Sequence, residues 1–140
     1  MRFKIASIAL AACLLAPGAW ATAASDSTLI NQGDQQWAQG KLDDARKSFE
    51  QAVAANPASV QAQMKLGGLL ISNNNYATAI PVYQKAISLD GNNVRAWIGL
   101  GMAYLHTGDK ELSRAAFEEA IRIEPARKAQ LARLTEASSK

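Results

Sequence analysis

The sequence is poor in the residues that build disulfide scaffolds and Cys/His metal sites. Its 140 residues include one Cys and one His. A disulfide framework needs several cysteines, and a structural zinc site needs a cluster of Cys or His ligands, so both classes are excluded. Aromatic residues make up only 6% of the chain, whereas hydrophobic residues make up 49% and charged residues 19%. This balance is typical of a globular protein rather than a disordered one, and the length suits a single domain.

The N-terminal segment has the order of a secretory signal peptide. Arg2 and Lys4 precede an uncharged stretch over residues 5–15, and two small-x-small triplets then end at Ala21 and Ala23. Basic, apolar and small-residue segments in this order are typical of exported proteins. The apolar stretch is also too short to span a bilayer comfortably. We therefore expect cleavage after Ala21 or Ala23, which gives a periplasmic or secreted protein without a membrane span.

Lipid anchoring is the alternative to simple cleavage. The tetrapeptide Leu-Ala-Ala-Cys at residues 10–13 resembles a bacterial lipobox, in which the cysteine becomes the lipidated first residue. Under this alternative the mature protein is a lipoprotein anchored through Cys13. Residues 14–24 stay largely apolar, whereas a lipoprotein usually continues with a polar tether, so we favour simple cleavage.

Loss of the signal peptide changes the net charge. The whole chain has 15 basic and 12 acidic residues, a net charge of +3. Without Arg2 and Lys4, 13 basic residues remain against 12 acidic ones, a net charge of +1. Such a small charge creates no general field that attracts phosphates or anionic lipids. We therefore do not expect nucleic acid among the partners.

The remaining chain repeats at an interval of 34 residues. Aligned at this offset without gaps, three units show matching columns of small, aromatic and helix-breaking residues. A period of this length is typical of solenoid proteins. The columns are Gly33, Gly67 and Gly101; Ala45, Ala79 and Ser113; Phe49, Tyr83 and Phe117; Ala52, Ala86 and Ala120; and the mid-unit breaks Gly40, Asn74 and Gly108.

Each unit is predicted to form two helices. In the third unit Trp97, Leu100 and Tyr104 recur at the spacing of one helix face. Gly108 and Asp109 then supply a turn and an N-cap before a second helix. Small glycine and alanine columns let the paired helices approach closely, and the aromatic column fills the space beside them. The inner face predicted for the second helix is Leu112, Ala116, Phe117, Ala120 and Ile121.

This pattern resembles the tetratricopeptide repeat (TPR) family, whose motif is W-x2-L-G-x2-Y, then A-x3-F, then P. The third unit carries Trp97, Gly101, Phe117 and Pro125 at the motif positions, with Ser113 in place of Ala. The resemblance implies an all-α, right-handed solenoid of three helix-turn-helix repeats plus a C-terminal capping helix, closed by Leu131 and Leu134. The expected organisation is a signal peptide at 1–23, repeats at 26–59, 60–93 and 94–127, and a capping helix at 128–140.

A second stripe runs beside the packing face of each first helix. By resemblance, the first helices line the concave surface, so this stripe would face a groove that binds an apolar peptide or an amphipathic helix. Gly68 and Gly99 would leave room for the partner. Burial of the stripe between neighbouring units is the alternative. The predicted groove residues are Ile30, Asp34, Trp37, Met64, Lys65, Gly68, Ile71, Arg95, Ile98, Met102, Leu105 and His106.

Some TPR proteins hold a partner's C-terminal carboxylate with Lys and Asn residues from successive first helices. The matching positions here are Ile30, Asp34, Lys65, Arg95 and Gly99. Only Arg95 keeps the expected character, and Asp34 opposes an anion. We therefore do not expect a carboxylate clamp in this chain.

No constellation of nucleophile and base is evident for catalysis. His106 is the single histidine, and its nearest carboxylate, Asp109, is assigned to a turn. We expect a non-enzymatic interaction module or scaffold of the cell envelope, with a protein or peptide partner and no cofactor or metal. The alternative is a lipid-anchored subunit of an outer-membrane assembly or secretion complex. Homo-oligomer formation stays open.

Overall fold

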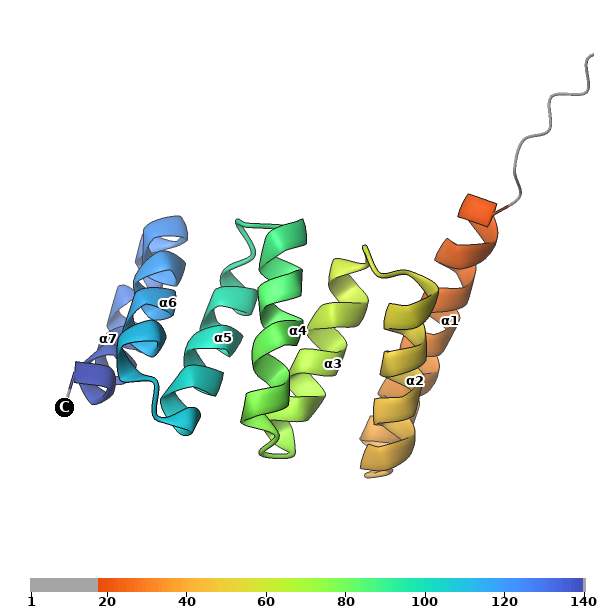
Figure 1. Cartoon of the computed structure of the whole chain (residues 1–140), viewed down its shortest axis with the longest axis horizontal. Coiled ribbons are helices and arrows are strands. Elements are labelled where there is room, and N and C mark those ends of the chain that lie inside the picture. The colour runs from red at the N-terminus through yellow and green to blue at the C-terminus, as the bar shows by residue number, and fades with distance from the viewer. Residues whose placement is uncertain (1–17, 140) are drawn as a thin grey trace, which may run out of the picture.

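The computed structural model describes the backbone of residues 18–139 and the side chains of residues 25–137. The predicted lipobox at residues 10–13 lies outside the described residues. All regular structure between residues 18 and 139 is helical (Figure 1). The elements are α1 (Gly18–Ala38), α2 (Leu42–Ala55), α3 (Val60–Ser72), α4 (Tyr76–Leu89), α5 (Val94–Thr107), α6 (Lys110–Ile123), the 3-10 helix η1 (Pro125–Arg127) and α7 (Lys128–Ser139).

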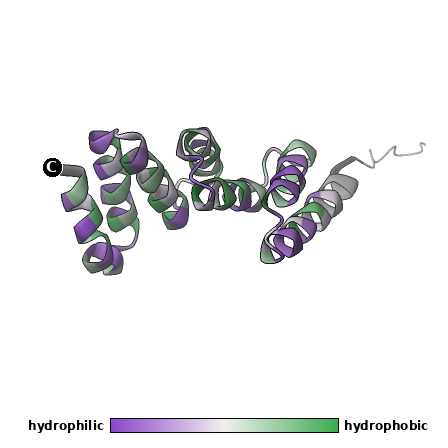
Figure 2. Ribbon diagram, turned by 90° about the horizontal axis from the view of Figure 1, so that it is seen from below, coloured by the Kyte–Doolittle hydropathy of each residue, from purple (hydrophilic) through white to green (hydrophobic). Residues whose placement is uncertain are grey.

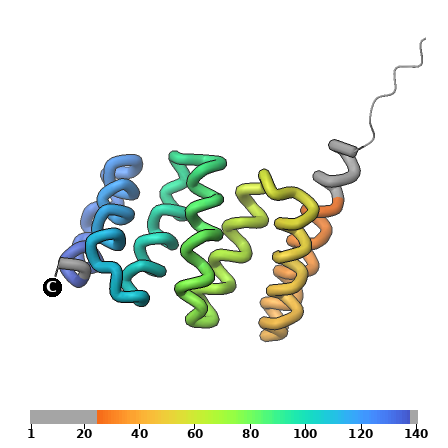
Figure 3. Tube along the Cα trace, in the orientation of Figure 1, coloured from red at the N-terminus to blue at the C-terminus, as the bar shows by residue number. Residues whose placement is uncertain are grey.

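The helices follow one another along the long axis of the molecule and reverse direction at each connection (Figures 1 and 3). Each helix packs against the next one in the chain, so α1 pairs with α2, α3 with α4, and α5 with α6. The first helices of successive pairs also touch, α1 with α3 and α3 with α5. Figure 2 shows hydrophobic and hydrophilic stretches alternating along these helices in a second view. The predicted three helix pairs with a closing helix are therefore present.

The turn inside each helix pair uses a left-handed backbone conformation. Its φ angle is +74° at Gly40, +58° at Asn74 and +92° at Gly108. Glycine adopts this conformation without steric cost, and asparagine tolerates it better than most other residues do. These residues are the mid-unit breaks of the repeat, so the sequence period and the chain reversals coincide.

The helix N-termini differ in how they are capped. The side chains of Ser59 and Asn93 accept hydrogen bonds from backbone N–H groups at 3.2 and 3.1 Å, at the starts of α3 and α5. Asp109 occupies the N-cap position of α6, but its side chain makes no capping hydrogen bond. Its carboxylate instead accepts a hydrogen bond of 2.9 Å from the hydroxyl of Thr107. The predicted turn and N-cap position at Asp109 are present, without a capping hydrogen bond from the side chain.

A packing seam joins the two helices of each pair. It consists of a first-helix glycine lying directly against the aromatic ring of the second helix. A Cβ on Gly67 would approach the Tyr83 ring to 2.9 Å, and one on Gly101 would approach the Phe117 ring to 2.7 Å. Only a residue without a Cβ fits such a contact. The pairs of the seam are Gly33 with Phe49, Gly67 with Tyr83, and Gly101 with Phe117.

The inner face of α6 agrees with the prediction at Ala116, Phe117, Ala120 and Ile121 and differs at its first position. Ser113 is fully buried, and its hydroxyl donates a hydrogen bond of 2.8 Å to the carbonyl of Gly101 in α5. Ala116 and Phe117 continue this face at helical spacing. Leu112 lies about 100° around the helix from Ser113 and is 51% exposed. Leu112 is therefore an exposed surface residue, and its predicted place on the inner face is wrong.

The last helix closes the solenoid. Leu131 in α7 is only 4% exposed and shares a cluster with Phe117, while Leu134 packs against the same cluster. Lys128 and Arg133 are exposed on the outer side. An apolar inner face with a polar back is what a terminal repeat helix needs. Within residues 18–139, no helix is both long and apolar enough to cross a membrane.

Candidate functional site

The first helices of the three pairs border a hollow of about 600 Å³. α1 contributes one residue to it and α3 contributes five, while the last two come from the N-terminus of α5 and the residue before it. Five predicted groove residues, from all three first helices, meet here: Trp37, Met64, Lys65, Gly68 and Arg95. The complete lining is Trp37, Val60, Gln61, Met64, Lys65, Gly68, Asn93 and Arg95. We call this hollow the groove.

The floor of the groove is apolar. Trp37 is half-buried and meets Phe49 edge to face, with ring centroids 6.2 Å apart and an interplanar angle of 78°. This contact holds the indole against the core. Met64 is also half-buried and packs on the same core. A Cβ on Gly68 would lie 3.6 Å from the indole, which is ordinary contact, so the missing side chain leaves free space beside Trp37.

The charged residues of the groove lining are Lys65 and Arg95; the predicted Asp34 does not line the hollow but pairs with Lys65 from beside it. The Nζ of Lys65 donates to both carboxylate oxygens of Asp34, at 2.8 and 2.7 Å. This pair joins α1 to α3. Arg95 is exposed, and within the described part of the chain its guanidinium has no ion pair. The side-chain oxygen of Asn93 is held by its capping bond to the backbone of α5.

Three lining residues were not among those predicted from the sequence. Val60 and Gln61 lie one helical turn before Met64 and Lys65, so extending the stripe by one turn would have identified both. Asn93 precedes α5 and has no place in a helix-face pattern. It reaches the groove because the start of α5 lies beside α3.

Ile30 does not line the groove. It is 2% exposed and packs with Ala52 of α2 and Ala62 of α3. The prediction for Ile30 is wrong because this turn of α1 lies between the helices of two successive pairs. Its apolar side chain is used for stacking, as the burial alternative anticipated.

Four other residues of the predicted stripe, one in α3 and three in α5, lie outside the groove and are partly covered. Ile98 and Met102 are half-buried and pack against the cluster that contains Phe117 and Leu131. Ile71 in α3 packs against the central core, and Leu105 is half-buried. None of these four residues lines the groove. The groove therefore lies nearer the N-terminal repeats than the whole stripe suggested.

Gly99 extends the packing seam from one helix pair to the next, because it lies against the ring of Tyr83 in the preceding pair. A Cβ at this position would collide with the ring of Tyr83, which also lies against Gly67. Tyr83 of α4 thus lies between α3 and α5. Gly99 leaves room for this ring and not for a partner, which corrects the expectation from the sequence. Beside Gly68 the space is open, and its use by a partner stays a prediction.

His106 has structural partners at the end of α5. Its ring stacks on Tyr76 of α4, with centroids 4.1 Å apart and an interplanar angle of 15°. Its Nδ1 lies 2.9 Å from the carbonyl oxygen of Met102. His106 does not contribute to the groove lining. Among the described residues, no three or more His, Cys, Asp or Glu side chains gather as a metal site would require.

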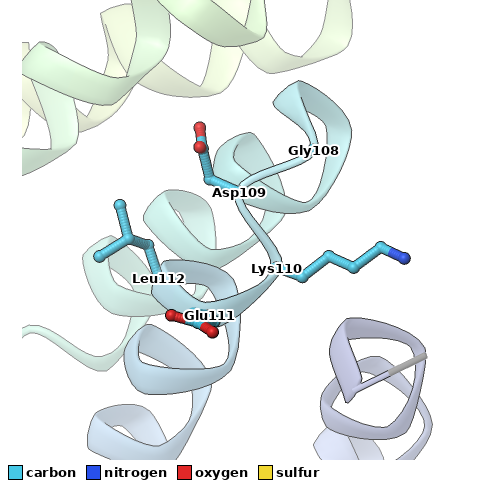
Figure 4. A pocket seen from close by; sticks show the side chains of 5 residues that line it. All are labelled: Gly108, Asp109, Lys110, Glu111 and Leu112. Atoms are coloured by element: carbon cyan, nitrogen blue, oxygen red, sulfur yellow. The ribbon is translucent and has the colours of Figure 1, made fainter.

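A smaller hollow of about 340 Å³ lies at the turn between α5 and α6. Five consecutive residues, 108–112, line it. Figure 4 shows that the side chains of Asp109, Lys110 and Leu112 point in different directions. The turn therefore brings no set of groups together on one point, and the groove is the better candidate site.

The comparisons with known proteins agree with this architecture. A family model described as "Tetratricopeptide repeat" matches residues 30–93 and 72–128. The general transcriptional corepressor trfA of Dictyostelium discoideum is 27% identical over 97 residues, which are 69% of this chain and 7% of that protein. The chain thus spans only a small share of the length of this curated relative.

Two solved structures have the same fold over most of both chains. The first TPR of Spaghetti (RPAP3), bound to the HSP90 peptide SRMEEVD, is 18% identical with a TM-score of 0.76, covering 84% of this chain and 95% of that one. The second TPR domain of human RPAP3, in complex with the HSP70 peptide SGPTIEEVD, is 22% identical with a TM-score of 0.76, covering 86% and 98%. These likenesses confirm the predicted right-handed, all-α solenoid of three helix-turn-helix repeats with a C-terminal capping helix.

Proposed function

The chain belongs to the tetratricopeptide repeat family, and from this premise we propose that it is a non-enzymatic interaction module that binds a peptide or helix of a partner protein in its groove. The observation that carries the proposal is the groove itself, in which an apolar floor lies beside the guanidinium of Arg95, which has no ion pair among the described residues. A hollow of about 600 Å³ falls within the usual range for binding pockets and accommodates a few side chains of a peptide.

The energetics favour a peptide over a small polar ligand. Trp37 and Met64 are both half-buried, so apolar surface remains to be covered. Burying a large apolar side chain contributes about 1.5–3 kcal/mol. Two such anchors and one charged interaction at Arg95 contribute favourably to binding, and further contacts along the peptide must offset the cost of ordering it. In the solved relatives, bound peptides of HSP90 and HSP70 support the use of this fold for peptide binding.

The test is a selection of peptides from a random displayed library on the purified protein. Gly68→Leu adds a side chain into the free space beside Trp37 without disturbing the packing seam, so we expect the enriched peptides to lose most of their affinity for this variant. Ala115→Leu places the same side chain on an exposed position of α6 and is the matched control. Equal affinity of both variants for the enriched peptides would rule out the groove as the binding site.

We also propose that the protein acts in the cell envelope after export. The expected cleavage positions, Ala21 and Ala23, lie within α1, and Asp26 is the first residue described as buried in that helix. Cleavage at either position would therefore keep the hydrogen bond of 3.0 Å between Asn56 and Asp26. Mass spectrometry of the mature protein tests the proposal. An N-terminus at Thr22 or Ala24 supports it, and a lipid-modified Cys13 establishes the lipid-anchored alternative.

A further inference from the structure

Three charged side chains lie in or beside the groove, and they are not equivalent. Lys65 is bound through both oxygens of Asp34, and the two side chains are 35% and 38% exposed. Arg95 lines the same groove and has no acidic partner in the described part of the chain. The groove thus offers one compensated cation and one uncompensated cation.

The ion pair between Lys65 and Asp34 limits how many acidic groups a ligand can place in the groove. A carboxylate that approaches Lys65 also approaches Asp34, and the repulsion between the two anions offsets the attraction to the ammonium. Arg95 carries no such penalty. Its planar guanidinium can hold a single carboxylate through two parallel hydrogen bonds. Charge complementarity therefore favours one acidic group on the ligand and disfavours several.

The apolar lining determines which side chain the ligand should carry beside its acidic group. Trp37, Met64 and Val60 line the groove together with the open space at Gly68. A large aliphatic or aromatic side chain fits against these groups, and it would lie in the same groove as the guanidinium.

Resting on the proposed function, we propose that the groove selects peptide segments with one large apolar side chain and a single nearby carboxylate, and that Asp34 is the specificity-determining residue that excludes further acidic groups. The apolar side chain packs against Trp37 and Met64, and the carboxylate binds Arg95. Asp34 acts through its ion pair with Lys65, which offsets the positive charge of Lys65.

The experiment uses three pools of short synthetic peptides, N-acetylated and C-amidated, in which randomised apolar residues flank zero, one or three aspartates. Binding of labelled pools to the full chain is measured by fluorescence anisotropy. Wild type should prefer the one-aspartate pool. Arg95→Gln should weaken that pool about tenfold, because Gln cannot form the charged, two-fold hydrogen bond to the carboxylate, and should affect the zero-aspartate pool much less. Asp34→Asn should strengthen the three-aspartate pool about tenfold by freeing Lys65.

Matched controls separate local from general charge effects. Arg114→Gln and Asp43→Asn change the same charges at exposed positions of α6 and α2, outside the groove. These variants should bind all pools as wild type does, and thermal unfolding checks that every variant is folded. If no pool binds, the proposed function fails. If pools bind with equal affinity, or if Asp34→Asn leaves the three-aspartate pool unchanged, peptide binding stands and the specificity proposal is overturned.

Discussion

Gly67 and Gly68 are neighbours in α3 but belong to different regions of the molecule. Gly67 lies in the packing seam, where the Tyr83 ring leaves no room for a Cβ. Gly68 lines the groove, where a Cβ would meet only the Trp37 ring at an ordinary contact distance. Helix periodicity rotates consecutive side chains by about 100°, so one step along the chain moves from tight packing to open space. The seam and the groove should therefore respond in opposite ways to the same substitution.

The largest effect is expected at the closed end of the solenoid. Leu131→Ala removes a nearly buried side chain from the cluster with Phe117 and should lower the free energy of unfolding by about 2–5 kcal/mol. Leu112→Ala at the exposed start of α6 is the control and should change it by less than about 0.5 kcal/mol. Urea denaturation followed by circular dichroism measures both. Similar losses for the two variants would contradict the assignment of α7 as a cap.

The seam should resist a single added methyl group. Gly99→Ala forces a Cβ against the Tyr83 ring and should lower the free energy of unfolding by about 1–3 kcal/mol, despite the better helix propensity of alanine. The combined variant with Tyr83→Leu removes the ring and should cost less than the two single changes added together. Additivity in this double-mutant cycle would show that the ring is not the obstacle.

Alkaline pH should weaken the seam through Tyr83. Burial raises the pKa of Tyr83 from 10.0 to about 12. The unfolded chain therefore loses this proton first, and the contribution to stability is complete below pH 10 and is lost as the pH rises from 10 to about 12. Two pKa units correspond to about 2 kcal/mol, after some discount for residual solvent contact. The difference in unfolding free energy between wild type and Tyr83→Phe, followed over this pH range, should shrink accordingly. A difference that stays constant would contradict the account.

The groove should tolerate what the seam does not. Gly68→Ala adds a Cβ in ordinary contact with Trp37 and removes a helix-interior glycine, so it should raise the free energy of unfolding by about 0.5–1 kcal/mol. Thermal unfolding of Gly68→Ala is compared with that of Gly67→Ala, which should destabilise the protein. A loss of stability at both positions would mean that Gly68 also belongs to the seam.

The repeat columns were sufficient to predict the architecture, because each column corresponds to a recurring contact. Gly33, Gly67 and Gly101 pack on the rings that stand sixteen residues later, and Gly40, Asn74 and Gly108 adopt the left-handed turns. Contacts within one repeat unit can be predicted from the sequence period, since each of the three units must satisfy the same geometry.

The groove was predicted only in part, because its shape depends on how successive units stack. Gly68 and Gly99 looked alike in the sequence, but Tyr83 from the preceding pair occupies the space beside Gly99. Ile30 followed the stripe and is nevertheless buried between pairs. The Asp34–Lys65 pair spans 31 residues and two repeats, so no spacing within one helix could reveal it.

The two methionines of the folded repeats allow the most direct test of the central claim. Met64 lines the groove, whereas Met102 packs into the cluster around Phe117. Methyl NMR of methionine-labelled protein, titrated with a peptide enriched in the library selection, should shift the Met64 methyl signal and leave the Met102 signal in place. A shift of Met102 with an unchanged Met64 would show that the peptide binds elsewhere and that the groove is not the binding site.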